Sequence, residues 1–538
     1  MKFTNKPYPD FSQADARASM RGALAALNDE YIGREWPHIL LGQDVTSGDD
    51  LKYTTIDPND PGRTIGTFQR YDPSTMDIDA LMDGANAASK RWNDMGIEIR
   101  AQVIETAADL MEDRLMLIGA ALVSEVGKSY IEAYAGIAEA IDFLRYNAEL
   151  AREEYDAPLI KSPASCGNMN RRELVPHGVF LGLDPFNFQV AIGTDQIAKP
   201  LLMGNAVIAS PSDKASLSGR LLFQTFVDAF AMCGVDSTGI INWAPGGADM
   251  AKPILSHPGL AGLCFTGSAE VLDTVISEYG MLRRHHGGKL VIAAAETSGV
   301  DALYVHEDAD LDVASTAVAA ALCGLSGQKC SALSTIIAHE AVQDQLLQMA
   351  SAKIDQIAFG PTREGAYLGA VISAAARDRI LAQVAELVSA VGVTKAYEKA
   401  VPADYPGFAV APTILLATPE QAQDQENLAR LRNTEIFGPV CTLIPVASLE
   451  EAEAVINASE FALTGGICSQ DRDVIEHAIR YFRAGNFYVN RKITGAFVGS
   501  EPFGGLVSRS SLFGISAGSR HALTLFYSDK TVSGFMPG

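Results

Sequence analysis

The segment GLSGQKCSALS, residues 324–334, places Cys330 between a lysine and a serine. Most free cysteines are buried and inert, so a small buried side chain is one interpretation of this residue. The other is a thiolate nucleophile, because the neighbouring Lys329 and a helix N-terminus could both lower the pKa of the thiol. The choice between them depends on the chemistry available elsewhere in the chain.

A carboxylate and an amide follow two apolar runs. Glu296 ends LVIAAAE, where burial would raise the pKa of its carboxyl and suit a general base near neutral pH. A salt-bridged hinge residue is the alternative. Asn187 lies in LDPFNFQVAIG, either as a simple turn residue or as an amide donor to an oxyanion at the mouth of a parallel sheet.

A third apolar run, in LCFTGSAEVLDTVIS, stops at the turn Thr266-Gly267-Ser268 before a helical pattern. Ser268 suits a helix N-cap, which explains the turn without any ligand. The N–H groups of a helix that starts after a glycine turn could also bind a phosphate.

Composition narrows the class of protein. A chain of 538 residues with 48% hydrophobic residues is expected to form two to four domains or subdomains. The net charge of -23 argues against nucleic acid or an anionic membrane as a partner. Seven scattered cysteines show neither a disulfide framework nor metal-ligand spacing, so we expect no metal. The start of the chain lacks the apolar core of a signal peptide, which favours a cytoplasmic protein.

The elements that must position these residues belong to an α/β fold. Residues 76–154 carry mostly helical periodicity, and short apolar runs then alternate with helical segments. The runs are GVFLGL, GNAVIAS, GIINW and LAGLCF, and a second series includes DALYV, STIIAH, APTILLA and CTLIPV. Such a pattern predicts two successive parallel-sheet α/β domains, with a hinge at residues 296–299. The strand-like tail, residues 519–535, would either pair with a strand of another subunit or form the edge strand of its own domain.

In this order the segments resemble the aldehyde dehydrogenase superfamily, over about residues 50 to 505. The shared features are a Pro-Phe-Asn-Phe run, a Phe-Thr-Gly-Ser turn, a glutamate that ends a strand and a cysteine 34 residues later. NTEIFGPV, FALTGGICSQD and GNFYVNRKITGAFVGSEPFGG follow in register.

The resemblance implies a domain plan. An N-terminal extension (1–45) precedes a Rossmann-like NAD-binding domain, residues 46–155 and 178–297. A catalytic domain (298–495) follows, and residues 156–177 and 506–538 would form a small β arm for oligomerisation. The expected assembly is a homodimer or higher homo-oligomer.

The resemblance also implies oxidation of an aldehyde to an acid with NAD as cofactor, and it favours the nucleophile interpretation of Cys330. Asn187 and the backbone N–H of Cys330 would hold the oxyanion, and Glu296 would activate the hydrolytic water. The implied cofactor-binding residues are Asp184, Ser210, Pro211, Asp213, Phe265, Thr266, Gly267, Ser268, Glu435 and Phe437. Ser210 stands where the superfamily usually has lysine, and the acid at Asp213 favours NAD over NADP.

Within the superfamily, SGQKCSA and TGAFVGSEPFGG resemble the branch that oxidises 1-pyrroline-5-carboxylate as glutamate γ-semialdehyde. The residues implied to hold the amino acid end of the substrate are Ser331, Gly495, Ala496 and Phe503. After Gly505, however, LVSRSSLFGISAGSRHA replaces the expected Ala-Ser-Gly run. The alternatives are another semialdehyde or an aromatic aldehyde, transfer of the thioester to coenzyme A, which Glu296 disfavours, and a catalytically silent scaffold.

Overall fold

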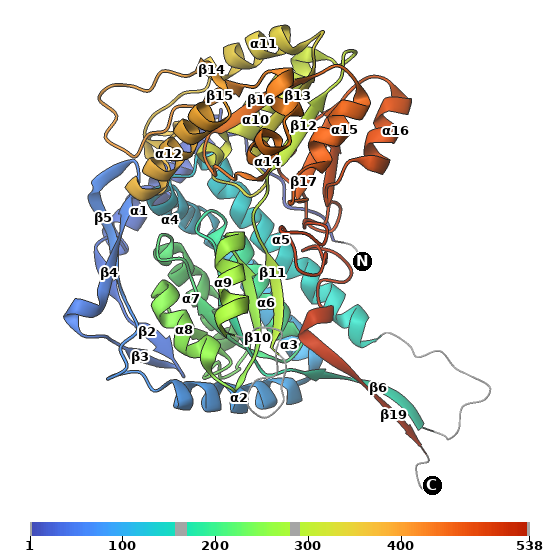
Figure 1. Cartoon of the computed structure of the whole chain (residues 1–538). Coiled ribbons are helices and arrows are strands. Elements are labelled where there is room, and N and C mark those ends of the chain that lie inside the picture. The colour runs from blue at the N-terminus through green and yellow to red at the C-terminus, as the bar shows by residue number, and fades with distance from the viewer. Residues whose placement is uncertain (1–2, 157–168, 280–290, 535–538) are drawn as a thin grey trace.

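A computed structural model describes residues 3–156, 169–279 and 291–534. Two α/β units lie one above the other in Figure 1, and a thin two-stranded arm leaves the lower unit. The predicted class, two parallel-sheet units with a small β arm, is confirmed. In the described part of the chain, no helix is long and apolar enough to cross a membrane.

A seven-stranded sheet forms the lower unit, in the order β11-β10-β7-β8-β9-β2-β3. Its parallel strands are β7 (Val179–Leu183), β8 (Ala206–Ser210), β9 (Ile241–Trp243), β10 (Leu260–Thr266) and β11 (Ile292–Glu296), and β2 (His38–Leu40) and β3 (Gln43–Val45) complete the sheet in antiparallel pairings. The strand order reverses between β7 and β10, the position at which open α/β sheets bind ligands.

The two faces of this sheet are covered by separate sets of helices. One set is α2 (Ile78–Asp94), α8 (Gly247–Ser256) and α9 (Ala269–Tyr279), and the other is α6 (Gln189–Leu202) and α7 (Ser216–Met232), with α3 (Gly96–Asp113), α4 (Leu115–Val126) and α5 (Tyr130–Tyr155) behind them. Val179 and Leu181 pack on the first set, whereas Phe180 between them packs on the second. This alternation explains why both faces of β7 are apolar.

The upper unit contains a second seven-stranded sheet, in the order β14-β15-β16-β13-β12-β17-β18. Its strands are β12 (Asp301–Val305), β13 (Leu333–His339), β14 (Thr394–Glu398), β15 (Thr413–Leu416), β16 (Val440–Val446), β17 (Thr464–Cys468) and β18 (Asn486–Val489), of which only β14 runs antiparallel to its neighbour. The helices α10 (Leu311–Cys323) and α11 (Gln343–Asp355) cover one face, and α12 (Ala374–Ala390), α13 (Pro419–Gln423), α14 (Gln425–Asn433), α15 (Leu449–Asn457) and α16 (Arg472–Tyr481) cover the other. The chain passes from the first sheet to the second at residues 297–300, where the hinge was predicted.

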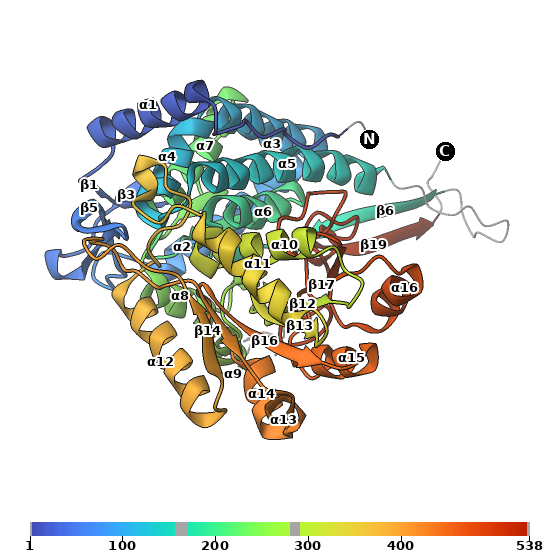
Figure 2. The ribbon, with the colours of Figure 1, turned by 90° about the horizontal axis from the view of Figure 1, so that it is seen from above.

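The amino-terminal residues are more integrated than the predicted extension. The helix α1 (Ala14–Glu30) packs on α4 (Figure 2), and β2 and β3 widen the lower sheet because Ile39 pairs with Trp243 of β9. The strands β1 (Arg34–Trp36), β4 (Lys52–Asp57) and β5 (Asp60–Gln69) form a small third sheet. The boundary predicted at residue 45 coincides with the end of β3, so the predicted extension contains two strands of the lower sheet.

The arm consists of β6 (Met169–Pro176) paired antiparallel with β19 (Tyr527–Gly534) of the same chain. Figures 1 and 2 show it extending away from the rest of the molecule. Of the segments predicted to form it, residues 157–168 lie outside the described residues. Residues 506–526 do not join it: they fold back over the two units before β19 begins.

Candidate active site

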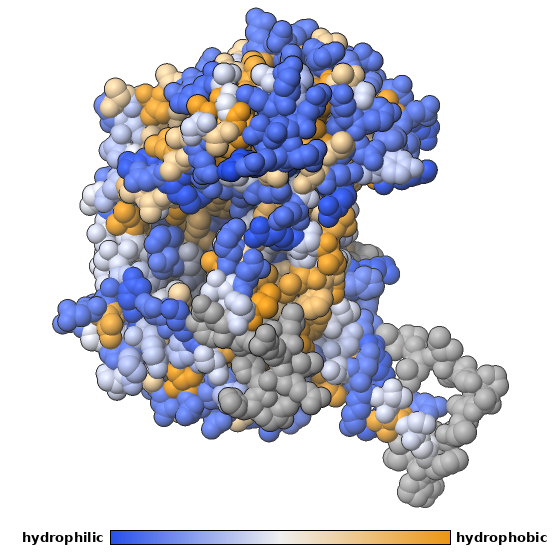
Figure 3. All heavy atoms as spheres, viewed as in Figure 1, coloured by the Kyte–Doolittle hydropathy of each residue, from blue (hydrophilic) through white to orange (hydrophobic). Residues whose placement is uncertain are grey.

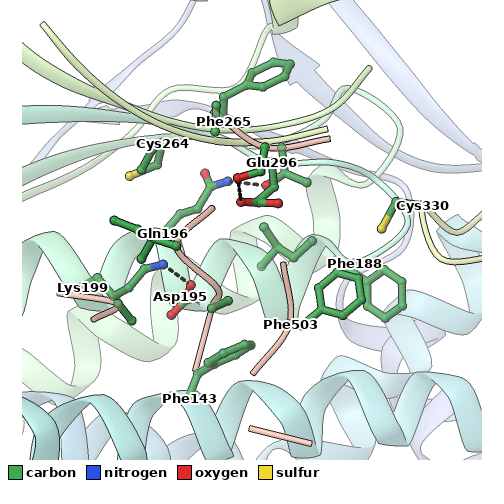
Figure 4. A pocket seen from close by; sticks show the side chains of 18 of the residues that line it. Phe143, Phe188, Asp195, Gln196, Lys199, Cys264, Phe265, Glu296, Cys330 and Phe503 are labelled. Atoms are coloured by element: carbon green, nitrogen blue, oxygen red, sulfur yellow. Dashed lines mark hydrogen bonds and ion pairs between the residues drawn. The ribbon is translucent and has the colours of Figure 1, made fainter. Parts of the chain in front are cut away.

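A pocket between the two units brings together residues predicted from distant parts of the chain. Its lining includes Glu296, Cys330, Ser331, Gly495, Ala496 and Phe503, which are all the predicted substrate residues and two of the three predicted catalytic ones. Glu296 and Cys330 border this pocket in Figure 4, together with Phe188 and Phe503. Figure 3 shows apolar surface where the two units meet. Much of the pocket lining is aromatic or aliphatic.

Cys330 lies in a loop between the short helix η2 (Gly324–Gly327) and β13. Leu325 and Ser326 adopt φ of 47° and 51°, a left-handed backbone that costs free energy for residues other than glycine. Residues 297–300, which connect the two sheets, come close to this loop at Gly299. A Cβ added at Gly299 would lie 2.2 Å from the carbonyl oxygen of Cys330. Only glycine therefore allows the connection between the two sheets to pass the nucleophile loop at this distance.

The electrostatics of Cys330 differ from the prediction. Burial, together with the nearby carboxyls of Asp301, Glu435 and Glu296, raises the pKa of its thiol. Lys329 does not lower it, because the Lys329 ammonium lies 2.6 Å from a carboxylate oxygen of Glu132. No helix begins at this point either, since the loop leads into β13. The protonated thiol is therefore the favoured form of Cys330 near neutral pH.

Asn187 is 4% exposed and lies in the loop between β7 and α6. Its Nδ2 donates a hydrogen bond of 2.9 Å to the carbonyl oxygen of Gln328, two residues before Cys330. An amide carries two N–H groups, and this contact needs only one of them. The contact fixes the side chain of Asn187 against the loop that carries the thiol.

Glu296 ends β11 with both carboxylate oxygens hydrogen-bonded. Ser511 Oγ donates to Oε1 at 2.6 Å, and the backbone N–H of Gly505 donates to Oε2 at 3.2 Å. Burial raises the pKa of Glu296 to about 7, the shift expected for a buried general base. Both donors are neutral groups, so within the described residues Glu296 does not form the salt bridge that the alternative interpretation required. Ser511 was missed in the sequence analysis, although it belongs to the atypical run after Gly505.

The Thr-Gly-Ser turn lies beside the same pocket. Phe265 and Thr266 line the pocket, and residues 266–268 are half-buried at the carboxyl end of β10. Ser268 Oγ accepts a hydrogen bond of 3.3 Å from the backbone N–H of Val271, so the predicted N-cap of α9 is confirmed. Gly267 and the first turn of α9 thus stand next to the point where the strand order reverses.

Glu435 and Phe437 belong to the loop between α14 and β16 and line a separate small pocket beside Gly299 and Lys329. Glu435 Oε1 accepts a 3.2 Å hydrogen bond from the backbone N–H of Gly299, and burial raises the pKa of Glu435 to about 7. Phe437, at φ 52°, packs edge to face on Phe186, with ring centroids 6.1 Å apart. The ring contact ties the upper unit to the loop after β7, and the hydrogen bond ties Glu435 to the segment that connects the two sheets.

Some predicted cofactor residues point elsewhere. Asp184 is buried against α6, accepts a 2.9 Å hydrogen bond from Gln189 Nε2, and has its pKa raised to about 7 by burial. Ser210 is 2% exposed, and its hydroxyl is covered by protein without a hydrogen-bond partner. Pro211 is also buried, whereas Asp213 is half-buried and its carboxylate lies 3.0 Å from the Lys214 ammonium. In this structure Asp184 and Ser210 therefore face the protein interior: Ser210 ends β8, whose side chains alternate between the two covered faces of the sheet, and Asp184 directly follows β7.

Comparison with known proteins agrees along the whole chain. A model described as the aldehyde dehydrogenase family matches residues 45–532. The chain is 31% identical over 535 residues to 1-pyrroline-5-carboxylate dehydrogenase 2 of Halalkalibacterium halodurans, covering 99% of each sequence. It is 33% identical to the solved 1-pyrroline-5-carboxylate dehydrogenase from Thermus with bound NAD, with a TM-score of 0.89 and 99% of each chain covered. A solved Mycobacterium tuberculosis Delta-pyrroline-5-carboxylate dehydrogenase bound with NAD shares 30% identity, with a TM-score of 0.86 over 98% of this chain and 95% of that one.

Proposed function

The chain belongs to the aldehyde dehydrogenase family, as the sequence predicted, and we propose that it oxidises glutamate γ-semialdehyde, the open form of 1-pyrroline-5-carboxylate, to glutamate. It is an NAD-dependent aldehyde dehydrogenase. The observation that carries the substrate proposal is the single pocket lined by Cys330, Glu296 and the four residues expected at the amino acid end of the substrate.

In the proposed reaction, the sulfur of Cys330 attacks the aldehyde carbon after its proton passes to a base. The amide of Asn187 and the backbone N–H of Cys330 stabilise the oxyanion of the resulting thiohemiacetal. A bound NAD, held by the turn at 266–268 together with Glu435 and Phe437, would supply the acceptor for the hydride that this oxidation removes from the carbon. The carbon is then a thioester on Cys330, and Glu296 takes a proton from the water that attacks it. Cleavage of the C–S bond releases the carboxylic acid and restores the thiol.

The protonation of Glu296 suits its proposed task. With its pKa raised by burial to about 7, the carboxyl exists in both forms near neutral pH. It can therefore accept a proton from the hydrolytic water and release it again without a large free-energy cost.

The residues beside the pocket fit NAD. The half-buried turn at 266–268 and the start of α9 supply backbone N–H groups of the kind that bind a pyrophosphate. Glu435 would bind a ribose hydroxyl, with Phe437 lining the same site. The carboxylate of Asp213 would repel a 2′-phosphate, which supports NAD over NADP. The side chains of Asp184 and Ser210 are covered by protein, so these residues would contribute to NAD binding only through the shape of the backbone that follows β7 and ends β8.

At the other end of the pocket, the hydroxyl of Ser331 and the backbone of Gly495 and Ala496 would bind the α-carboxylate and ammonium groups. Gly495 has φ 82°, a left-handed conformation that turns the backbone after β18. Phe503 would pack on the aliphatic part of the substrate. The aromatic character of the remaining lining is the observation that keeps an aromatic aldehyde as the second candidate.

The test is NADH formation, followed at 340 nm, with glutamate γ-semialdehyde and a panel of aliphatic, aromatic and other semialdehydes, and with Cys330→Ala as the control. We expect a preference for glutamate γ-semialdehyde of at least a hundredfold in kcat/KM, about 2.7 kcal/mol of discrimination. A higher kcat/KM for another aldehyde would refute the substrate. Equal rates for the protein and the control would support a silent scaffold.

We also propose that the protein is a homodimer or a higher homo-oligomer assembled through the arm. The ribbon of β6 and β19 has exposed edges and extends from the rest of the chain, and such edges readily pair with another strand.

A further inference from the structure

The run after Gly505, which departs from the superfamily pattern, lies against the strand that carries Glu296. We propose that Ser511 in this run is a positioning residue that holds the carboxylate of Glu296 in place for hydrolysis of the thioester. The proposal rests on the proposed function, because it assigns Ser511 a part in the step that Glu296 performs there.

The backbone places Ser511 directly opposite Glu296. β11 is an edge strand, and residues 510–512 pair with it along this edge. The N–H of Thr297 donates to the carbonyl oxygen of Ser510 at 2.8 Å, and the N–H of Leu512 donates to the carbonyl oxygen of Ala295 at 3.3 Å. Glu296 and Ser511 form an antiparallel bridge between these contacts. Side chains opposite one another in an antiparallel pair lie on the same face and within reach.

The hydroxyl of Ser511 is oriented by its neighbours. Its Oγ accepts a 3.0 Å hydrogen bond from the N–H of Gly514 and donates to Glu296 Oε1 at 2.6 Å. The N–H of Gly505 holds the other oxygen, Oε2, at 3.2 Å. Since one donor binds each oxygen, the plane of the carboxylate is fixed from both sides by the same run of residues.

The run is held independently of the contact between Ser511 and Glu296. Ser510 is fully buried: its Oγ donates to the carbonyl of Ser298 at 2.8 Å and accepts from the N–H of Ala462 at 3.1 Å. The hydroxyl of Thr297 also donates to the carbonyl of Arg509. These contacts join the run to both units, so replacement of the Ser511 hydroxyl alone leaves its backbone supported.

Other charges near Glu296 come from several elements. The titratable side chains that share its pocket are Glu139 of α5, Asp195 and Lys199 of α6, Cys264 of β10 and Cys330. Lys199 favours the ionised carboxylate, but it forms an ion pair with Asp195 (Figure 4), and neither residue contacts Ser511. The hydrogen bond from Ser511 favours the ionised form as well, against the burial that raises the pKa of Glu296. Loss of the hydroxyl should therefore raise this pKa further.

The test compares Ser511→Ala with Ser511→Thr, which keeps a hydroxyl, and with Ser508→Ala as the matched control. Ser508 belongs to the same run, and its hydroxyl bonds only within it, to Leu506 and Ser510. Its backbone pairs with that of Ser511, a contact that the alanine variant keeps. For each protein, the NADH burst is measured by stopped flow and the later release of acid by rapid quench, from pH 5.5 to pH 9, with the aldehyde found to be the best substrate.

We expect Ser511→Ala to keep a full burst, because the attack by Cys330 and the hydride transfer precede hydrolysis. Its acid release should fall about fivefold at pH 7 and about tenfold at pH 5.5, and the acid limb of that rate should move up by about one pH unit, the size of one hydrogen bond to a charged group. Ser511→Thr should restore the wild-type limb, and Ser508→Ala should not change it.

An unchanged acid limb in Ser511→Ala, or faster acid release, would overturn the proposal. If Ser511→Ala does not fold, Ser511→Cys, a weaker donor, must shift the limb in the same direction, and an unshifted limb there would count against it equally. A wild-type protein that forms no NADH from any of the aldehydes, like Cys330→Ala, would instead overturn the proposed function, so the two failures are distinguishable.

Discussion

The side-chain amide of Asn187 donates a hydrogen bond of 2.9 Å to the carbonyl oxygen of Gln328, joining the loop after β7 to the loop that carries Cys330. Gln328 is bonded in turn to the upper unit, because its Oε1 accepts a 2.8 Å hydrogen bond from the N–H of Ile372. The position of Asn187, the proposed oxyanion donor, relative to Cys330, the proposed nucleophile, therefore depends on a contact between the two units.

Replacement of this amide tests the contact. Asn187→Ala should lower the rate of the NADH burst by about 10²–10³, the usual loss when one oxyanion donor is removed. Asn187→Asp should be no better, because a carboxylate repels the oxyanion. Single-turnover stopped flow measures both, and a burst rate within threefold of wild type would show that Asn187 holds the loop but does not stabilise the oxyanion.

The raised pKa of the Cys330 thiol predicts slow alkylation at neutral pH. Burial is the first cause and the neighbouring carboxyls, including Glu296, are the second. Iodoacetamide should therefore react at a rate that still rises above pH 9. Removal of one negative neighbour favours the thiolate and lowers the pKa of Cys330, so Glu296→Gln should react several-fold faster than wild type at pH 8.5 although it loses acid release.

Glu340→Gln is the matched control for this experiment, because Glu340 is exposed and follows the opposite end of β13. Equal or slower alkylation of Glu296→Gln, relative to that control, would contradict the electrostatic explanation.

The ion pair of Lys329 and Glu132 should stabilise the fold and hold the nucleophile loop. Their side chains are only 16% and 11% exposed, so removal of one partner leaves the other charge almost buried. Lys329→Met should lower the free energy of unfolding by about 3 kcal/mol, and the double variant with Glu132→Gln should recover most of it. Urea unfolding measures both, and additive losses would exclude coupling.

This ion pair also predicts a pH dependence. Burial alone would raise the pKa of Glu132, but the charges of Lys329 and Lys128 and the hydrogen bonds outweigh it, so the pKa is lowered from 4.5. A group with a lowered pKa in the folded state adds stability above its unfolded pKa and loses it as the pH falls. The difference between wild type and the double variant should therefore shrink below pH 4.5.

Ser331 offers a test of substrate recognition. Ser331→Ala should lower kcat/KM for glutamate γ-semialdehyde about tenfold or more, the cost of one hydrogen bond to a charged group. Propanal lacks that group and should be oxidised at an unchanged rate, which makes it an internal control. Equal losses for both aldehydes would indicate that Ser331 acts on Cys330 and not on the substrate.

The arm predicts the assembly. Truncation after Phe526 removes β19 and leaves β6 without its partner in the same chain. Light scattering coupled to size exclusion should report a smaller species than the full chain, with the circular dichroism of the two units retained. An unchanged mass would place the contact between subunits elsewhere.

Local sequence patterns determined the strands and most of the chemistry. Apolar runs such as residues 179–183 and 206–210 must form strands buried on both faces, because the turns that bound them leave no room for a helix. The ends of such runs in a parallel sheet meet at one edge, which is why Asn187, Glu296 and the turn at 266–268 could be grouped before any contact was known. Ser331, Gly495, Ala496 and Phe503 came from short motifs that the pocket brings together.

Only the tertiary structure decided how these groups are held. Ser511 lies 215 residues from Glu296, and Lys329 lies 197 residues from the Glu132 that binds its charge. Neither pairing can be predicted from the spacing of residues in the sequence, because each depends on where a loop lies between the two sheets. The inward side chains of Asp184 and Ser210 and the addition of residues 38–45 to the lower sheet have the same origin. The sequence specifies which side chains are available, whereas distances across the fold determine which of them shift a pKa or fix a carboxylate.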